Sequence, residues 1–519
     1  MTQRSELSRR TILKLGMVAP ALAAAPTIRA ATQGASMKPN ILFIMGDQHR
    51  GDCIGADGHP VVRTPNMDRI GNEGIRFSRA YTAVPSCTPA RSGLLTGLTP
   101  WHHGMLGYGR VGEKYPIEKP RVLRDAGYYT LGIGKMHWCP QRISHGFHKT
   151  ILDESSREET IDFRSDYRAW FETEAPGLVY NATGIGWNDY RAKPYVLPEH
   201  LHPTRWTGDV ATRFIESDQE DAPFFLKVSF ARPHSPYDPP QRFWDLYEDA
   251  PIPPAVVGDW ANKRYAPLGG NPDSPWHGDF GPEAVRRARQ GYYGNVTFID
   301  EQIGRILEVL EKRNLLDETL IVYTADHGDM TGDHHMWRKT YAYEASARIP
   351  MLMRWPEGLV SAARGQVCTL PVELRDILPT FMDASAAPGA EKLDGDSMLK
   401  LARGETDSWR NYIDFEHDTC YAPSNHWNGL TDGQWKYIYH AQDGQEQLFN
   451  LDDDPSELHD LAGDAAYTKT LQQWRGRLVA HFEERGEPFL KNGQLVPRPE
   501  RMLYSPNYPG TPAFDAMKG

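Results

Sequence analysis

The segment that decides the fold reads PNILFIMGDQ over residues 39–48. Its unbroken apolar run, which ends at Gly46-Asp47, is typical of a strand buried on both faces of a parallel sheet. Moving outward, we predict further strands at residues 75–82, 128–133, 224–230, 320–324 and 349–353. Helices are expected from Thr64-Pro65 onward and over residues 283–315 and 373–384. This alternation predicts an α/β fold in which helices sandwich a large, mixed and mostly parallel sheet.

The pattern changes after about residue 386. Residues 412–416, 434–440 and 446–451 read as short antiparallel strands with Asp-Gly turns between them, and residues 467–485 read as a helix. We therefore predict a catalytic domain over residues 38–386 and a C-terminal subdomain over 387–519, in which a helix packs on a small sheet. The irregular segments 154–221 and 232–279 are expected to shape the pocket above the strand ends.

Composition narrows the function classes. The 519 residues carry a formal net charge of -11, which argues against nucleic acid as a partner. The sequence contains no run of about 18 apolar residues, so no membrane span is expected. Five scattered cysteines do not form a disulfide framework, and the odd count leaves at least one thiol for another use.

The first thirty residues have the order of an export signal. Ser8-Arg9-Arg10-Thr11 is a twin-arginine signature, an Ala-rich apolar stretch follows, and Ile28-Arg29-Ala30 resembles a cleavage site. Residues 1–30 therefore predict passage through the twin-arginine (Tat) translocase to the periplasm or the outside of a bacterial cell.

The most informative motif reads PSCTPARSGLLTG over residues 85–97. We predict a helix with Thr88 as its N-cap and Pro89 as its first residue, which puts Cys87 immediately before the helix N-terminus. Free backbone N–H groups and the helix dipole favour an anion there, and Arg91 lies one turn further on. A nucleophile at Cys87 would therefore meet an anionic substrate such as sulfate or phosphate.

Acidic residues follow two of the predicted strands. Asp47-Gln48 ends the first strand, and Asp326-His327-Gly328-Asp329 ends the strand at residues 320–324. Ligands of open α/β sheets bind beyond the carboxyl ends of the strands, so two acidic strand ends can hold one cation between them.

The motif Cys-x-Pro-x-Arg, followed by Leu-x-Thr-Gly, resembles the signature of the formylglycine-dependent sulfatases, and in detail the bacterial arylsulfatase-like members. The resemblance runs from Asn40 to about Leu461 and implies an alkaline-phosphatase-like fold. It implies that a formylglycine-generating enzyme converts Cys87 to formylglycine (3-oxoalanine). It also implies one divalent metal held by Asp47, Gln48, Asp326, His327 and the modified Cys87. Many sulfatases have Asp-Asp and Asp-Asn at these places, whereas this chain has Asp-Gln and Asp-His. We expect calcium, with manganese or magnesium as alternatives.

The resemblance also implies catalytic roles for residues outside the motif. In Gly134-Lys135-Met136-His137, Lys135 would contact the sulfate and His137 the formylglycine hydroxyl. His234 would protonate the leaving oxygen, and Lys339 would be the second lysine on the sulfate beside Arg91. Six further polar residues could line the pocket, although an ordinary structural role is at least as well supported for each: His102, His103, Tyr108, His145, Asp238 and His417.

These residues together predict a sulfuric ester hydrolase acting on an aryl or carbohydrate sulfate, with choline sulfate as another possible substrate. The main alternative is a phosphonate monoester or phosphodiester hydrolase, which shares the signature and the Asp-Gln/Asp-His metal set. A non-catalytic binder of sulfated glycans is a third hypothesis, which the complete catalytic set disfavours. The oligomeric state stays open.

Overall fold

The structure is a computed structural model that describes residues 38–155, 157, 162–217, 222–264 and 276–510. The predicted export signal at residues 1–30 lies outside this range. Within the range, no helix combines the length and the apolar character that crossing a membrane requires.

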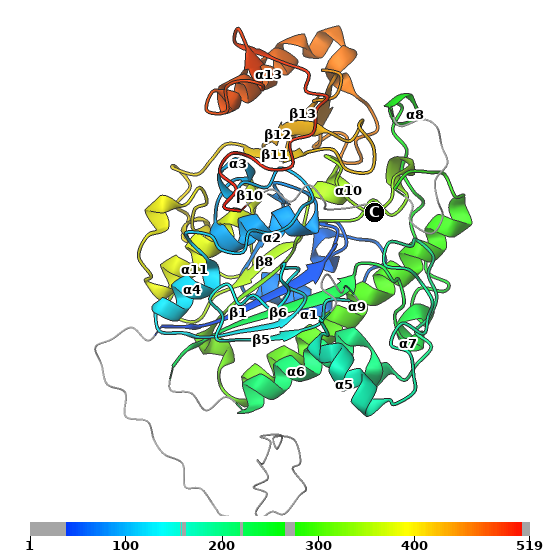
Figure 1. Cartoon of the computed structure of the whole chain (residues 1–519), viewed down its shortest axis with the longest axis vertical. Helices are drawn as coiled ribbons and strands as arrows, with labels where there is room; N and C mark the ends of the chain where they lie inside the picture. Colours follow the sequence, from blue (N-terminus) through cyan, green and yellow to red (C-terminus); the bar gives the residue numbers. More distant parts are fainter. Residues whose placement is uncertain (1–37, 156, 158–161, 218–221, 265–275, 511–519) are drawn as a thin grey trace, which may run out of the picture. The chain divides into compact units, whose positions relative to one another are not determined.

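The centre of the fold is an eight-stranded sheet with the strand order β5-β4-β6-β1-β7-β8-β2-β9 (Figure 1). Only β8 pairs antiparallel with both of its neighbours, and every other pairing in this sheet is parallel. The predicted mixed, mostly parallel sheet is therefore confirmed. Its strands are β1 (Asn40–Asp47), β2 (Ile75–Phe77), β4 (Tyr129–Gly134), β5 (Lys149–Leu152), β6 (Phe224–Pro233), β7 (Thr319–Ala325), β8 (Met351–Arg354) and β9 (Gln366–Cys368).

Both faces of this sheet are covered by helices, which explains why β1 is apolar throughout. Ile41, Phe43 and Met45 join the core under α2, α4, α11 and α12. Leu42 and Ile44 point to the other face and join the core under α1, α6 and α9. These covering helices are α1 (Pro65–Asn72), α2 (Cys87–Thr96), α4 (Lys119–Asp125), α6 (Pro203–Ser217), α9 (Pro282–Lys312), α11 (Ile377–Ser385) and α12 (Met398–Ala402).

A second, antiparallel sheet has the order β11-β12-β13-β14. Its strands are β11 (Ile413–His417), β12 (Trp427–Thr431), β13 (Trp435–His440) and β14 (Glu446–Asn450), and α13 (Thr468–Phe482) packs on it through Trp474 and Leu478. Its opposite face shares a core with Tyr81 and Tyr343, which precede residue 387 in the chain. The small sheet and its helix confirm the predicted architecture, whereas the domain boundary at residues 386/387 stays a prediction.

The remaining elements are short. They are α3 (Pro100–His103), α5 (Asp166–Glu174), α7 (Gln241–Asp245), α8 (Ala261–Arg264), α10 (Glu344–Ala347), the pair β3 (Ala80–Tyr81) and β10 (Val372–Glu373), and the pair β15 (Leu490–Lys491) and β16 (Gln494–Leu495).

Two predicted elements differ from those in the structure. Residues 75–82 are not one strand, because β2 and β3 belong to different sheets. The helix expected over residues 373–384 begins at Ile377, after β10 and a 3₁₀ turn. Helix α1 begins at Pro65 with Thr64 as its N-cap residue, as predicted, but the Thr64 side chain makes no capping hydrogen bond: its Oγ1 accepts from Gly55 N at 2.8 Å and donates to Asp68 at 2.9 Å. Asp300 on α9 accepts instead from Asn66 N and Met67 N at 3.0 and 2.7 Å.

Candidate active site

The two acidic strand ends meet because β1 and β7 are neighbours in parallel register. Gly46 pairs with Ala325, so Asp47 and Asp326 leave the sheet side by side at its carboxyl edge. Gln48 N donates to Asp326 Oδ1 at 3.0 Å and ties the two ends together. The two acidic strand ends thus lie together at one edge of the sheet, as the sequence predicted, and the site at this edge stays a prediction.

Four buried side chains at this edge could hold a metal ion. Asp47, Cys87, Asp326 and His327 each offer one ligand atom, and these atoms lie within 4.8 Å of one another. His327 Nδ1 donates to Gly328 O at 2.9 Å, which leaves Nε2 facing the Cys87 Sγ at 3.1 Å. Such a second hydrogen bond is how proteins orient an imidazole toward a metal. Two carboxylates and one imidazole therefore make a donor set that suits a divalent cation.

Gln48 lies beside this cluster, in contact with charged side chains. Its Oε1 accepts from Lys339 Nζ at 2.6 Å, and its amide nitrogen donates to Asp329 Oδ2. The structure thus brings Gln48 to the site, where its side-chain oxygen accepts a hydrogen bond from Lys339, the lysine that is expected to contact sulfate.

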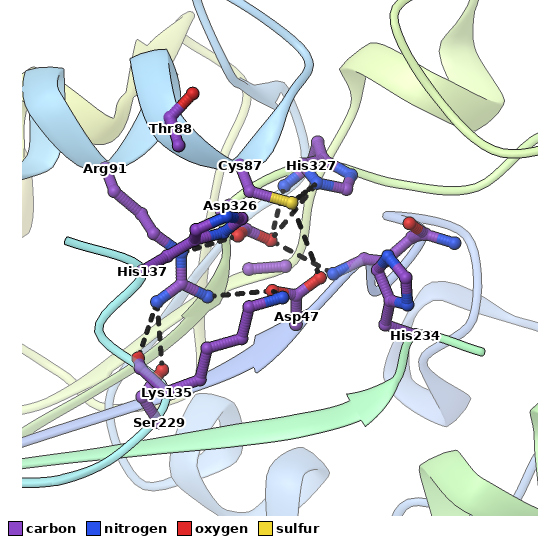
Figure 2. Close-up of polar contacts among 12 residues, drawn as sticks. Asp47, Cys87, Thr88, Arg91, Lys135, His137, Ser229, His234, Asp326 and His327 are labelled. Atoms are coloured by element: carbon purple, nitrogen blue, oxygen red, sulfur yellow. Dashed lines mark hydrogen bonds and ion pairs between the residues drawn. The ribbon is translucent and has the colours of Figure 1, made fainter. Parts of the chain in front are cut away.

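Cys87 is the first residue of α2, and its sulfur faces the strand ends (Figure 2). The predicted helix start was two residues late, since Ser86 is the N-cap and Thr88 lies inside the helix. Burial and Asp47 would each raise the pKa of the Cys87 thiol, but Lys339, Lys135 and His327 outweigh them, so this pKa is lowered. A thiol at an N-terminus surrounded by cations is set up to meet an anion.

Arg91 lies one turn into α2 and joins the acidic strand ends to β4 and β6 (Figure 2). Its guanidinium donates to Asp326 Oδ2 at 2.9 Å and Asp47 Oδ2 at 3.0 Å. It also donates to Lys135 O at 2.6 Å and to Ser229 Oγ at 3.3 Å.

Lys135 follows β4 and places a positive charge beside Asp47. Its Nζ lies 2.6 Å from Asp47 Oδ2 and 4.4 Å from the centre of the Trp187 ring. Burial would raise the pKa of Asp47, but the charges of Lys135 and Arg91 hold it well below its usual range.

His234 sits between Lys339 and Trp187. Its Nδ1 donates to Ser235 O at 2.9 Å, its Nε2 accepts from Lys339 Nζ at 2.7 Å, and its ring stacks on Trp187 at 4.1 Å. Burial and the neighbouring Lys339 charge lower the pKa of His234 well below its usual value. The imidazole is therefore neutral, with Nε2 turned toward the site.

His137 approaches the site from the end of β4. Its Nε2 lies 3.3 Å from Tyr108 OH and contacts the Arg157 guanidinium, and its backbone N–H donates to Glu154 Oε1 at 3.0 Å. Burial, followed by the charges of Arg157 and Lys135, lowers the pKa of His137 well below its usual value.

Thr340 joins the nucleophile loop to the loop that carries Lys339. Its N–H donates to Pro85 O at 2.8 Å, and its carbonyl accepts from Trp427 Nε1 of β12 at 2.9 Å. Asn425 Nδ2 donates to its hydroxyl at 2.5 Å. Residues of the small sheet thus reach the loops on both sides of the site.

The structure brings every predicted site residue to this pocket region and separates them from most of the less certain candidates. His102 pairs with Asp394, His145 with Glu118, and Asp238 with Arg232, which are ordinary structural contacts. Tyr108 does reach His137, and His417 Nε2 lies 2.9 Å from Ser86 Oγ.

Sequence reasoning missed four residues that contact this set: Glu154, Trp187, Ser229 and Asp329. Only Asp329 carried a signal, as part of the acidic run after β7. Ser229 lies inside an apolar strand. Glu154 and Trp187 belong to the segment 154–221, which was predicted to be irregular but contains the helices α5 and α6.

Comparisons with known proteins agree with this geometry. Residues 39–387 match the family described as Sulfatase, and residues 332–484 match the C-terminal region described as N-sulphoglucosamine sulphohydrolase, C-terminal. An arylsulfatase of Clostridium perfringens is 37% identical over 89% of this chain and 98% of its own length. A choline-sulfatase of Rhizobium meliloti is 30% identical over 86% of this chain and 87% of its own.

Among solved structures, the phosphonate monoester hydrolase of Agrobacterium radiobacter superposes with a TM-score of 0.70 at 25% identity. The superposition covers 89% of this chain and 99% of that one, which confirms the expected fold. The extent of the family match and the identity to the arylsulfatase show that the chain belongs to the sulfatase family and is a sulfuric ester hydrolase.

Proposed function

We propose that this sulfatase hydrolyses aryl or carbohydrate sulfate esters through a formylglycine that a formylglycine-generating enzyme makes from Cys87. The observation that carries the proposal is the position of the Cys87 sulfur. It starts helix α2, lies 3.1 Å from His327 Nε2, and faces the edge where Asp47 and Asp326 meet. This placement puts a modified residue 87 next to both the helix N-terminus and the candidate metal ligands.

Two groups would complete this pocket. A formylglycine would supply a hydrated aldehyde, whose two hydroxyls on one carbon allow both attack on sulfur and later expulsion of sulfate. One divalent cation, for which we propose calcium, with manganese or magnesium as alternatives, would polarise the sulfate oxygens. Its ligands would be Asp47, Gln48, Asp326 and His327, together with the modified residue 87.

The side chains around this point supply binding and proton transfer. Lys135, Lys339 and Arg91 would hold the negative oxygens of the sulfate, and their fixed charges would stabilise the transition state more than the ground state. His234, which is oriented through Nδ1, would take a proton at Nε2 from Lys339 Nζ, 2.7 Å away, and pass it to the departing alcohol oxygen. His137 would take a proton at Nε2 from the hydroxyl of residue 87 in the sulfate-releasing half-reaction.

A phosphonate monoester hydrolase activity is the second candidate. The observation that favours it is the likeness to the Agrobacterium radiobacter enzyme. The higher identity to the arylsulfatase supports the sulfatase activity as the principal one.

One experiment tests modification and reaction class together. The mass of the peptide containing residue 87 should lie about 18 units below that of the cysteine form, and the same preparation should release sulfate from an aryl sulfate. Faster turnover of an aryl phosphonate ester than of the aryl sulfate would favour the second candidate. An aldehyde without any sulfate release would refute the proposal.

We also propose export through the Tat translocase to the periplasm or the outside, and this rests on residues 1–30 alone. Replacing Arg9 and Arg10 by lysine should leave the protein in the cytoplasm. A cell fractionation that finds the variant still exported would contradict this signal.

A further inference from the structure

Trp187 is a half-buried aromatic residue that contacts two of the proposed catalytic side chains. Its ring stacks on that of His234, with 4.1 Å between the two centroids and 24° between the planes. The ammonium of Lys135 lies 4.4 Å from the centre of the same ring and 2.6 Å from Asp47 Oδ2. Trp187 therefore lies against both the proposed acid and a proposed sulfate-binding lysine, although no catalytic step uses it.

The loop that carries Trp187 is attached to the residue that follows the acid. Ser235 Oγ donates to Asp189 O at 2.6 Å and lies 3.0 Å from Gly186 O. These two carbonyls stand on either side of Trp187 in the chain. The backbone as well as the ring stacking thus holds the indole beside His234.

This position lies where the leaving group of a sulfate ester has to pass. His234 is only 1% exposed, whereas the ring stacked on it is partly open to solvent. With the sulfate on Lys135 and the bridging oxygen at His234, the atoms beyond that oxygen come next to the indole that contacts both (Figure 2 shows the two side chains at the site). A ring in the leaving group gains from such a contact, because aromatic surface is removed from water on both sides.

The charge around the indole disfavours one class of leaving group. Indole rings bind quaternary ammonium groups well, but this indole already contacts the ammonium of Lys135. A second cation would lie close to the first and be repelled by it. Asp189 does not offset this repulsion, because it already pairs with Arg191 at 2.9 Å. An uncharged ring avoids the cost.

We propose that Trp187 determines leaving-group specificity: it packs against an uncharged ring, aromatic or sugar, and cationic leaving groups such as choline bind poorly. This proposal rests on the proposed function, since it assigns the leaving group of the same reaction. It narrows the substrate class to ring-bearing sulfate esters and gives the selection to one residue of the chain.

The test measures affinity and requires no turnover. Sulfonates in which CH₂ replaces the bridging oxygen cannot be hydrolysed as esters, so calorimetry on the metal-loaded protein can compare them. The ring probes are phenylmethanesulfonate and 6-deoxy-6-sulfo-D-glucose, which separate an aromatic from a sugar ring. At least one of them should bind about tenfold more tightly than ethanesulfonate. The cationic probe, 2-(trimethylammonio)ethanesulfonate, should bind no more tightly than ethanesulfonate.

Variants assign the preference to Trp187. Trp187→Ala should weaken binding of the preferred ring probe about tenfold and that of ethanesulfonate less than about twofold. Any disturbance of Lys135 affects all sulfonates alike, so the ratio of the two affinities isolates the ring contact. Trp187→Phe should keep most of that ratio. Trp170→Ala is the matched control, because Trp170 is a half-buried tryptophan of α5 that packs against Trp206, and it should leave every affinity unchanged.

Three results would overturn the proposal: no ring probe binds more tightly than ethanesulfonate, the cationic probe binds as tightly as the better ring probe, or Trp187→Ala leaves the affinity ratio unchanged. Slower hydrolysis in Trp187→Ala at an unchanged ratio would mean that Trp187 only positions His234. Failure of the proposed function would look different, because the unaltered protein would then carry the aldehyde and release no sulfate from an aryl sulfate.

Discussion

Replacement of Arg91 by lysine should cost the metal-free protein a large part of its stability. Arg91 is buried and donates to two carboxylates, Asp326 at 2.9 Å and Asp47 at 3.0 Å, and to two further oxygens. A lysine head group is a single point and cannot span both carboxylates. Loss of one charge-assisted hydrogen bond costs about 1.5–3 kcal/mol, and each buried oxygen left without a donor adds about 1 kcal/mol or more. We therefore expect a loss of about 3–5 kcal/mol.

The assay is urea unfolding followed by tryptophan fluorescence, with a chelator present so that no bound cation adds stability. Arg142→Lys is the matched control, because Arg142 pairs with Asp166 at 2.6 Å with both side chains more than a third exposed. That exchange should cost less than about 1 kcal/mol. If Arg91→Lys costs no more than Arg142→Lys, Arg91 does not hold the strand ends together.

Three further predictions concern the acid, the cation and pH. His234→Gln should lower the rate of alkyl sulfate hydrolysis by about 10²- to 10⁴-fold. The rate with p-nitrophenyl sulfate should fall much less, because a good leaving group needs no proton. Equal losses of rate with both substrates would exclude His234 as the acid. Calcium added back to chelated protein should raise the melting temperature, and Asp326→Asn should remove most of that rise; an unchanged rise would place the ion elsewhere. Burial raises the pKa of Asp300 from 3.8 to about 7, so the folded state binds one more proton than the unfolded state between about pH 4 and 7. Stability should therefore fall across that window as pH rises, and Asp300→Asn should flatten the fall; an identical pH profile in the variant would contradict this.

The sequence predicted the framework of the site because that framework depends on local signals. The apolar run before Asp47 and the one before Asp326 both mark buried strands, and parallel neighbours bring their ends to one edge. The start of α2 was harder to place, since Pro89 marks only the first turn. Any of the first few helical residues can be proline, because their N–H groups have no intrahelical partner.

Long-range contacts account for what could not be predicted. The cap of α1 comes from Asp300, more than 200 residues away in the chain, while the nearby Thr64 is used by Gly55 and Asp68. Trp187 lies in an irregular segment, and nothing in its neighbourhood indicates that it stacks on His234. The short strand β12 contains a glycine and gives little periodic signal, so only its pairing between β11 and β13 defines it.

The contacts of Thr340 restrict how the loop before Cys87 can open. Since its backbone and side chain connect Pro85, Trp427 and Asn425, the loop before Cys87 cannot open without breaking contacts to the small sheet. Amide hydrogens around residue 87, residue 340 and β12 should then exchange with solvent at a common rate, as one cooperative unit. A chain cut after residue 386 would lose these contacts and would expose Tyr81 and Tyr343, which share a core with the small sheet. Variants that are designed to change the substrate range should therefore preserve the contacts between the large sheet and the small sheet.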